Sequence, residues 1–484
     1  MTTCFGSDAF RLARTAVVTL VAGCASTSAV PGFRDMERTV EQRTGHRLRW
    51  KEDARDDRNL DRRMAALLAG PLSVDGAVQV ALLNSPELQA IYEDLSLGQA
   101  DVVQAGLPRN PVFSADITTA EREALDPNLI VGVTQTFLDL LLIPARKKVA
   151  AAEFDAAKFR VGNAVLNVAA QVKIAFYAVQ AAEQELTVRQ TMAQAEEASF
   201  ELAEQQAGAG NVSELAVANE KTQYLQARLD VVHSEEGVDA TRERLTRLMG
   251  LPERSWRAAQ RLPDLPVSDP SIGPLEEQAL RDRLDLAALR QEIQTLSYAL
   301  DLARSSRWTG VIDIGVDVAR LKDGHIALGP RASLELPLFD QRQAQIARLE
   351  AQLRKSERLL EECVVQVRSE VRGAHDRLRY ARQAAEQYRS LIIPTREEVV
   401  ALSQQEYDAM LVGVYQLIAA KQAEVAAYGE YIDSVRDYWS ARAELERALG
   451  GPLVERPPPP PSRPPSPPRV DSPEPVRENL HSHS

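Results

Sequence analysis

One helical pattern, running without interruption from about Pro144 to Ala207, most limits what this chain can fold into. Proline suits the first position of a helix, so we place the start at Pro144. Apolar residues then recur at spacings of three and four, as in a coiled coil, at Val161, Val165, Val168, Val172, Phe176 and Val179. Such a helix is on the order of 95 Å long at 1.5 Å per residue, too long for a compact globular domain.

The chain repeats one pattern twice, at an offset of about 200 residues. The matched positions are Leu88 with Leu286, Phe137 with Phe339, and Gly250 with Gly450. We therefore predict a first repeat over 72–250, a linker over 251–274 and a second repeat over 275–450. Each repeat is expected to contain a helix, two strands, a very long helix, a tight turn and a second long helix.

Four short segments alternate apolar and polar residues, which predicts strands near 112–120, 129–137, 311–319 and 331–338. Four aromatic residues lie at the strand ends that join the helices: Phe113, Phe137, Trp308 and Phe339. A one-sided aromatic girdle is typical of a membrane barrel at its interface, although a soluble hairpin also alternates. Four strands are too few to close a barrel, so the membrane interpretation requires several copies of the chain.

The N-terminus predicts export. Arg11 and Arg14 precede a short apolar stretch that ends at Val21-Ala22-Gly23-Cys24, which indicates a signal peptide over 1–23. An ordinary signal peptide with a stray cysteine is the alternative. A cysteine after two small residues resembles the lipobox of bacterial lipoproteins, which implies that Cys24 is acylated and that the protein is sorted to the outer membrane. Residues 24–71 would then form a polar, loosely packed, lipid-anchored arm.

Several functions are excluded or unsupported. A net charge of -12 argues against a nucleic-acid partner. Three cysteines cannot form a disulfide framework, and Cys363 is predicted to be a packed helical residue. No motif of a hydrolase, nucleotide-binding or metal site is present, so we predict no catalytic residue, cofactor or metal. The proline-rich tail over 451–484 is predicted to be disordered.

The chain resembles the TolC-like outer-membrane efflux factor family over roughly residues 72–450. The segments that carry the resemblance are Ala77–Leu88, Gln99–Leu107, Pro108–Pro111 and Leu336–Asp340. The resemblance implies a mainly α fold with a transmembrane β-barrel, in which a homotrimer shares a twelve-stranded barrel and an α-helical periplasmic tunnel. It also implies a passive exit channel for metal ions or drugs that works with a periplasmic adaptor and an inner-membrane transporter. An exit duct for type I protein secretion and a lipid-anchored periplasmic coiled-coil scaffold are the alternatives.

Two groups of candidate site residues follow. The resemblance implies that the turns between the long helices meet the adaptor, with Gly210, Asn211, Ser213, Gly413 and Tyr415 as contact residues. Glycine or asparagine is expected where the chain reverses with positive φ, and Ser213 as a helix N-cap. The strand carboxylates are candidates for a lumen-facing, cation-preferring surface or else for plain solvated surface: Asp116, Asp313, Asp317 and Glu335.

Overall fold

The structure is a computed structural model that describes residues 28–51, 57–118, 128–253, 256–259, 261–320 and 325–453. These described residues belong to one compact unit that ends at Leu453. Cys24, the predicted signal peptide and the tail from residue 454 lie outside the described residues.

The first half contains α2 (Val30–Thr44), α3 (Asp57–Leu68), β1 (Pro71–Leu72), α4 (Val74–Asn84), α5 (Pro86–Gly106), β2 (Val112–Thr118), β3 (Asn128–Thr136), α6 (Phe137–Gly208) and α7 (Glu214–Leu248). The second half contains β4 (Arg257–Ala258), α8 (Ile272–Asp282), α9 (Leu284–Ser305), β5 (Ile312–Arg320), β6 (Ile326–Leu334), α10 (Gln343–Gln387), the π-helical turn η1 (Tyr388–Ile392), α11 (Ile393–Asp408) and α12 (Val414–Leu449). Both halves therefore run through two helices, two strands and two long helical segments joined by a turn.

The longest helix begins earlier than its sequence predicts. α6 starts at Phe137, directly after β3, and Pro144 lies inside it. Proline removes one backbone donor but does not stop the helix, because the 72-residue segment is held by packing along its length. The chain therefore passes from strand to helix without a loop.

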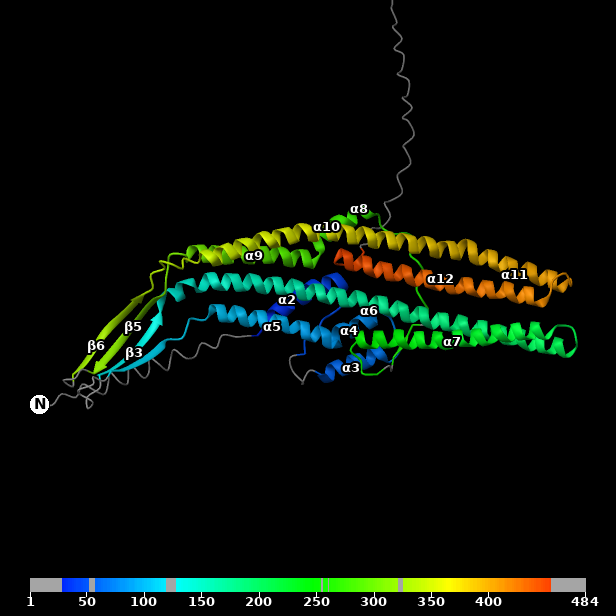
Figure 1. The fold of residues 1–484 in the computed structure, drawn as a ribbon, viewed down its shortest axis with the longest axis horizontal. Coiled ribbons are helices and arrows are strands. Elements are labelled where there is room, and N and C mark those ends of the chain that lie inside the picture. Colours follow the sequence, from blue (N-terminus) through cyan, green and yellow to red (C-terminus); the bar gives the residue numbers. More distant parts are fainter. Residues whose placement is uncertain are drawn as a thin grey trace, which may run out of the picture. The chain divides into compact units, whose positions relative to one another are not determined.

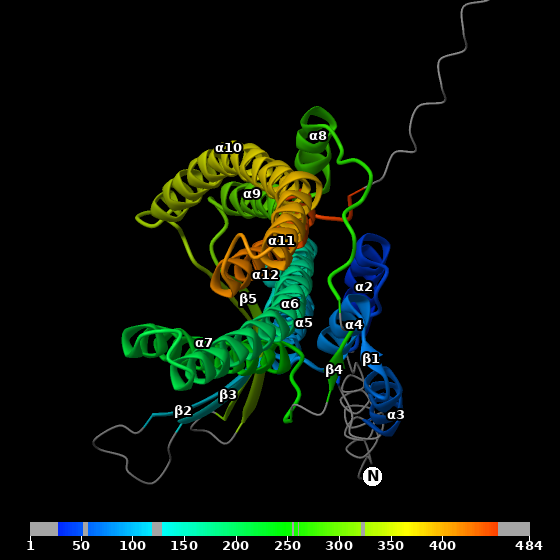
Figure 2. The ribbon, with the colours of Figure 1, turned by 90° about the vertical axis from the view of Figure 1, so that its right-hand side faces the viewer.

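The long helices lie side by side in a layer, with the four-stranded sheet at one end and the turns at the other (Figure 1). α6 packs against α5, α7, α9 and α12, and α10 packs against α9 and α12. The view along the helices shows α7 and α10 on opposite sides of α6 and α12 (Figure 2). Near the sheet, the helices therefore lie in the lateral order α5, α6, α9, α10. Near the turns, the order is α7, α6, α12, followed by α10 and its continuation α11.

The sheet continues this lateral order. Its antiparallel strands are arranged β2-β3-β5-β6, so each strand extends the helix to which it is joined. The first three strands lie within two residues of their predicted bounds, but β6 begins at Ile326, whereas the prediction began at residue 331. The strand extends further toward its N-terminal end than the alternation predicted, and Pro330 pairs with Val316. Within the single chain β6 is an edge strand, a position that tolerates proline.

The predicted loose arm is wrong for the described part of 24–71. The helix α2 buries Phe33, Met36 and Val40 in the protein core. The Arg43 guanidinium at its C-terminal end donates to the carbonyl oxygens of Asp282 and Gly450. Burial of an apolar helix face, which charge-rich neighbouring sequence concealed, ties this arm to both repeats.

The predicted linker is also partly structured. β4 pairs in parallel with β1, and the Trp256 indole beside it is buried and donates to Thr246 Oγ1 at 3.0 Å. α8 begins at Ile272, three residues before the predicted start of the second repeat at Leu275.

Among the described helices, α6 alone is long and apolar enough to cross a membrane. However, 67% of its most apolar stretch is buried inside the protein, so we assign it to the core.

Two equivalent glycines terminate the repeats in the left-handed conformation. Gly250 has φ +67° and lies against the link between α4 and α5, while Gly450 has φ +74° and lies against the link between α8 and α9. A Cβ on Gly450 would be 3.0 Å from the Asp282 carbonyl oxygen and from Arg283 Cα.

We therefore expect Gly450→Ala to lower the free energy of unfolding by about 2 kcal/mol. Alanine is strained in the left-handed conformation, and its Cβ would also be too close to the backbone of Asp282 and Arg283. Denaturant unfolding followed by far-ultraviolet circular dichroism measures this. Gly451→Ala is the matched control, since nothing lies within 4 Å of its Cβ position. Equal stability of the two variants would contradict the prediction.

Candidate functional site

The strand register separates the sheet into an apolar face and a polar face. Residues paired across neighbouring strands share a face, and alternate residues change face. One face carries Phe113, Ile117, Leu129, Val133, Ile314, Val316, Val318, Leu328 and Leu334, all exposed in the single chain. Such a large exposed apolar surface indicates contact with lipid or with another protein.

The opposite face brings the predicted strand carboxylates together. The strand register places Asp116, Asp313 and Asp317 on the same face of the sheet. Glu335, just beyond the end of β6, lies on this face too, because its N–H donates to the Val311 carbonyl oxygen and extends the pairing. Thr136 Oγ1 donates to Asp313 Oδ1 at 2.8 Å, and Arg331 Nη1 lies 3.6 Å from Asp317 Oδ2. Four carboxylates and one arginine make this face acidic within the described strands.

Close packing on this face requires a glycine. Gly132 pairs with Asp317, and a Cβ built on Gly132 would collide with the Asp317 carboxylate. The absence of a side chain at Gly132 thus leaves room for the acidic group above it.

The four predicted interface aromatics lie at the end of the sheet that joins the helices. Phe113 is near the start of β2, and Phe137 is the first residue of α6. Trp308 precedes β5, and Phe339 follows β6. All four side chains are exposed, Phe339 to 93%.

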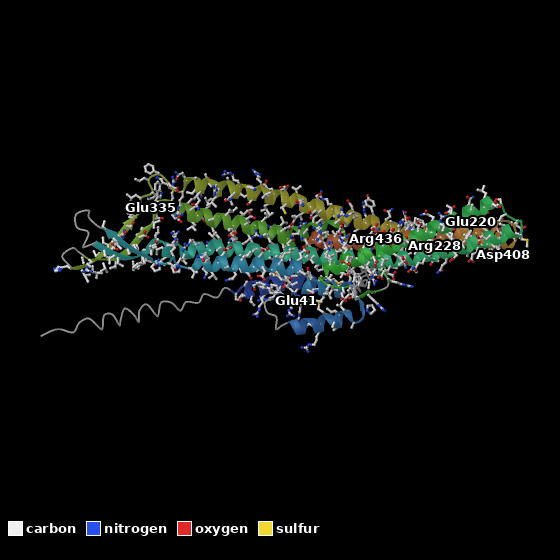
Figure 3. All side chains as sticks on the ribbon, turned by 60° about the horizontal axis from the view of Figure 1, so that its bottom comes forward. Glu41, Glu220, Arg228, Glu335, Asp408 and Arg436 are labelled. Atoms are coloured by element: carbon white, nitrogen blue, oxygen red, sulfur yellow. The ribbon has the colours of Figure 1, made fainter. Side chains whose placement is uncertain are left out.

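The helix turns at the far end are equivalent in geometry. In the first, Asn211 N–H donates to the Gln206 carbonyl and Gly210 N–H to the Ala207 carbonyl, both at 2.9 Å. In the second turn, Leu411 N–H donates to the Glu406 carbonyl and Met410 N–H donates to the Tyr407 carbonyl, both at 2.8 Å. Both turns are therefore Schellman motifs. Figure 3 shows Glu220 and Asp408 at this end, opposite Glu335.

The residues with positive φ differ from those expected. Gly210 has φ +75°, but its counterpart is Met410 with φ +59°, and neither Asn211 nor Gly413 has positive φ. Gly413 instead occupies the N-cap position of α12, with φ -81° and no side chain to cap the helix. As predicted, Ser213 caps α7 by accepting from Ala216 N–H at 3.3 Å. The hydrogen-bond pattern, not the residue type, determines which position is left-handed.

Tyr415 connects the two helical hairpins near this end. Its hydroxyl donates to Gln206 Oε1 on α6 at 3.3 Å, and burial together with the Glu220 carboxylate raises its pKa. Farther from the turns along the same two helices, Gln422 on α12 donates to Glu196 on α6. Burial, and then the charge of Glu220, raises the pKa of Glu196.

Sequence reasoning missed the Glu196–Gln422 contact, since the partners are 226 residues apart and no local pattern links them. It also missed a charged cluster at the junction of sheet and helices, where Arg146 donates to both oxygens of the buried Asp139 carboxylate at 2.9 and 3.2 Å. An Asp and an Arg seven residues apart on one helix were the available signal.

No group of three or more metal-ligating side chains occurs within the described ranges. Cys363 Sγ lies 3.9 Å from Asp285 Oδ2, and burial followed by the Asp285 charge raises the pKa of the thiol. The thiol is therefore kept in its unreactive, protonated form.

A family model described as outer membrane efflux protein matches residues 77–251. Over these residues the chain is similar to the outer membrane efflux protein family. A curated relative, the cobalt-zinc-cadmium resistance protein CzcC of Cupriavidus metallidurans, is 20% identical over 79% of this chain and 91% of its own length.

Solved structures share the fold of this chain. A membrane protein from Pseudomonas aeruginosa is 19% identical, with a TM-score of 0.65 over 78% of this chain and 92% of its own. The CmeC outer membrane channel of Campylobacter jejuni is 12% identical, with a TM-score of 0.67 over 78% and 85%. Because the sequence identities are this low, the structural similarity establishes only a common fold, in which long helices carry a sheet at one end.

Proposed function

We propose that this chain forms an outer-membrane exit channel of a tripartite efflux system, through which metal ions or drugs pass without catalysis. The sheet supports this proposal most directly. It has an exposed apolar face and an acidic face, and its two edge strands, β2 and β6, each have one side without a partner strand in the single chain. In a membrane every strand edge must be paired, which requires neighbouring copies to complete a barrel.

The edges of the helical layer support a closed ring. On the side of β2, the helix α7 exposes Leu225, Leu229 and Val232; on the side of β6, η1 and α11 expose Leu391 and Leu402. The two edges differ, so copies join head to tail, and such contacts close into a ring when the rotation between copies closes. A homotrimer with a twelve-stranded barrel is our proposal for that assembly.

Two observations favour metal cations as cargo. The CzcC relative is named for cobalt-zinc-cadmium resistance. The polar sheet face carries Asp116, Asp313, Asp317 and Glu335, and a ring of such carboxylates favours the passage of cations. An exit duct for type I secretion is the second candidate within the same fold, whereas a periplasmic scaffold leaves the exposed apolar face unexplained.

The remaining proposals concern placement and partners. Acylation of Cys24 would anchor the chain in the outer membrane, with the helices extending into the periplasm. The helix turns with Gly210, Asn211, Ser213, Gly413 and Tyr415 would meet a periplasmic adaptor that is joined to an inner-membrane transporter.

A planar-bilayer recording combined with a resistance assay tests the proposed function. We expect the purified protein to form pores with a cation preference that is reduced in Asp313→Asn/Asp317→Asn. Deletion of the gene is expected to lower resistance to cobalt, zinc or cadmium. A protein that leaves the bilayer impermeable and is recovered only from soluble periplasmic fractions would favour the scaffold alternative.

Substitution of Gly413 tests the adaptor contact. No atom lies within 4 Å of a Cβ built on Gly413, so a larger residue leaves the chain's own packing unchanged. We expect Gly413→Trp to weaken adaptor binding at least about tenfold, equivalent to 1.4 kcal/mol, and to lower efflux. Gly413→Ser, which copies the Ser213 cap, is the matched control and should retain binding. Normal adaptor affinity of the Trp variant would argue against this contact.

A further inference from the structure

A cavity of about 260 Å³ lies at the junction between the sheet and the helices. Its lining comes from the link between α5 and β2, the end of β3, the start of α6, the link between α9 and β5, and the link between β6 and α10. The charged residues that line it are Arg109, Asp139, Arg307, Glu335, Asp340 and Arg342.

The carboxylates of this cavity are engaged by the chain itself. Asp139 accepts from Arg146, with Arg109 Nε at 3.6 Å. Glu335 Oε2 accepts from Val311 N–H at 3.1 Å, and Asp340 Oδ1 from Arg342 N–H at 2.8 Å. Three arginines and three carboxylates thus line the cavity, and each of the three carboxylates already accepts a hydrogen bond from the chain itself.

Two guanidinium groups at the cavity have only neutral hydrogen-bond partners among the described residues. Arg307 Nη2 donates to Gln341 Oε1 at 3.3 Å, and Arg342 Nη1 donates to Ser306 Oγ at 2.7 Å. Arg307 Nε is buried and has no hydrogen-bond partner among the described residues. A buried, unsatisfied donor on a charged group is costly unless an anion or water completes it.

We propose that this cavity binds a phosphate group, held by the guanidinium groups of Arg307 and Arg342. The planar donor fork of arginine matches the oxygens of phosphate, and these charge-assisted bonds are strong. Arg307 lies 4.9 Å from the ring centre of Trp308, which fixes the direction of its side chain.

The phosphate has two possible sources with the same chemistry. One is free inorganic phosphate. The other is a phospholipid headgroup, because the exposed Trp308 and Phe339 are direct sequence neighbours of cavity-lining residues at the end of the sheet that joins the helices. Only the lipid source rests on the membrane insertion proposed above, and the free anion does not.

Tryptophan fluorescence tests the proposal on the full-length protein in a maltoside detergent, which contains no phosphate. Trp308 is next to Arg307, whereas Trp50, Trp256 and Trp439 pack in the core. We expect inorganic phosphate, at constant ionic strength, or phosphatidylglycerol in mixed micelles to change the emission saturably. Diacylglycerol, which lacks the headgroup, should not, and Trp308→Phe should lose the signal.

The variants decide the assignment. Arg307→Gln/Arg342→Gln is expected to weaken binding at least about tenfold, the effect of losing charge-assisted hydrogen bonds. Arg358→Gln removes an exposed, ion-paired arginine of α10 and should bind as the wild type does. Arg342→Gln alone serves if the double variant does not fold. A response to inorganic phosphate alone identifies the free anion, and a response to phosphatidylglycerol alone identifies the lipid; both support the site. No saturable response to either probe, or an equal response of the Gln variants, overturns it.

Discussion

Replacement of Val316 by arginine is expected to prevent stable insertion of the chain into the outer membrane. Val316 lies in the middle of β5 on the apolar face, where it pairs with Val133 and Pro330. An arginine that faces lipid at the centre of a barrel costs about 2–4 kcal/mol, and each copy in the proposed ring would bear that cost. We expect loss of the heat-modifiable oligomer from outer-membrane fractions, measured by electrophoresis without boiling.

The matched control for this substitution lies on the other face of the same sheet. Ser333 on β6 pairs with Asp313, so Ser333→Arg places the same side chain opposite a carboxylate. This variant should insert and assemble, with a reduced cation preference in bilayer recordings. Normal insertion of Val316→Arg would show that the apolar face does not contact lipid.

Removal of the Arg283 side chain is expected to cause a large loss of stability. Its guanidinium is nearly buried and contacts Asp285 and Glu370, each at 2.6 Å, and the Ala448 carbonyl oxygen at 3.4 Å. These contacts join the start of α9 to α10 and to the end of α12. Arg283→Met would leave both carboxylates without their cation.

We expect Arg283→Met to lower the free energy of unfolding by about 3 kcal/mol, the low end for a broken buried pair. The low end applies because Asp285 and Glu370 remain 28% and 26% exposed, so water screens them in part. Arg281→Ala, which removes an arginine that is 71% exposed, should cost less than about 1 kcal/mol. Denaturant unfolding of both variants provides the comparison, and equal losses would contradict the role of Arg283.

The same ion pairs predict a pH dependence. Burial alone would raise the pKa values of Asp285 and Glu370, but the hydrogen bonds and charge of Arg283 lower both pKa values overall. Their contribution is therefore complete above the unfolded pKa of about 4 and is lost as pH falls through the lower folded values. Stability of the wild type should fall below about pH 4 more steeply than that of Arg283→Met. Parallel curves would contradict this linkage.

The candidate site was predictable where local pattern sufficed. Alternation in the strands placed Asp313 and Asp317 on one face, and the paired register puts Asp116 on the same face. Equivalent spacing in the two repeats located the helix turns. The left-handed residue of the second turn was not predictable, because Met410 takes that conformation from the hydrogen bonds that close the helix.

The sequence by itself determined the long helices, the alternating strands and the duplication, because spacings of two, three and four residues report directly on backbone geometry. Only the tertiary structure decided the lateral order of strands and helices, the burial of α2, and the meeting of Arg307 and Arg342 at the junction cavity. Those features join residues that belong to separate elements of the fold, so no local spacing in the sequence reports on them.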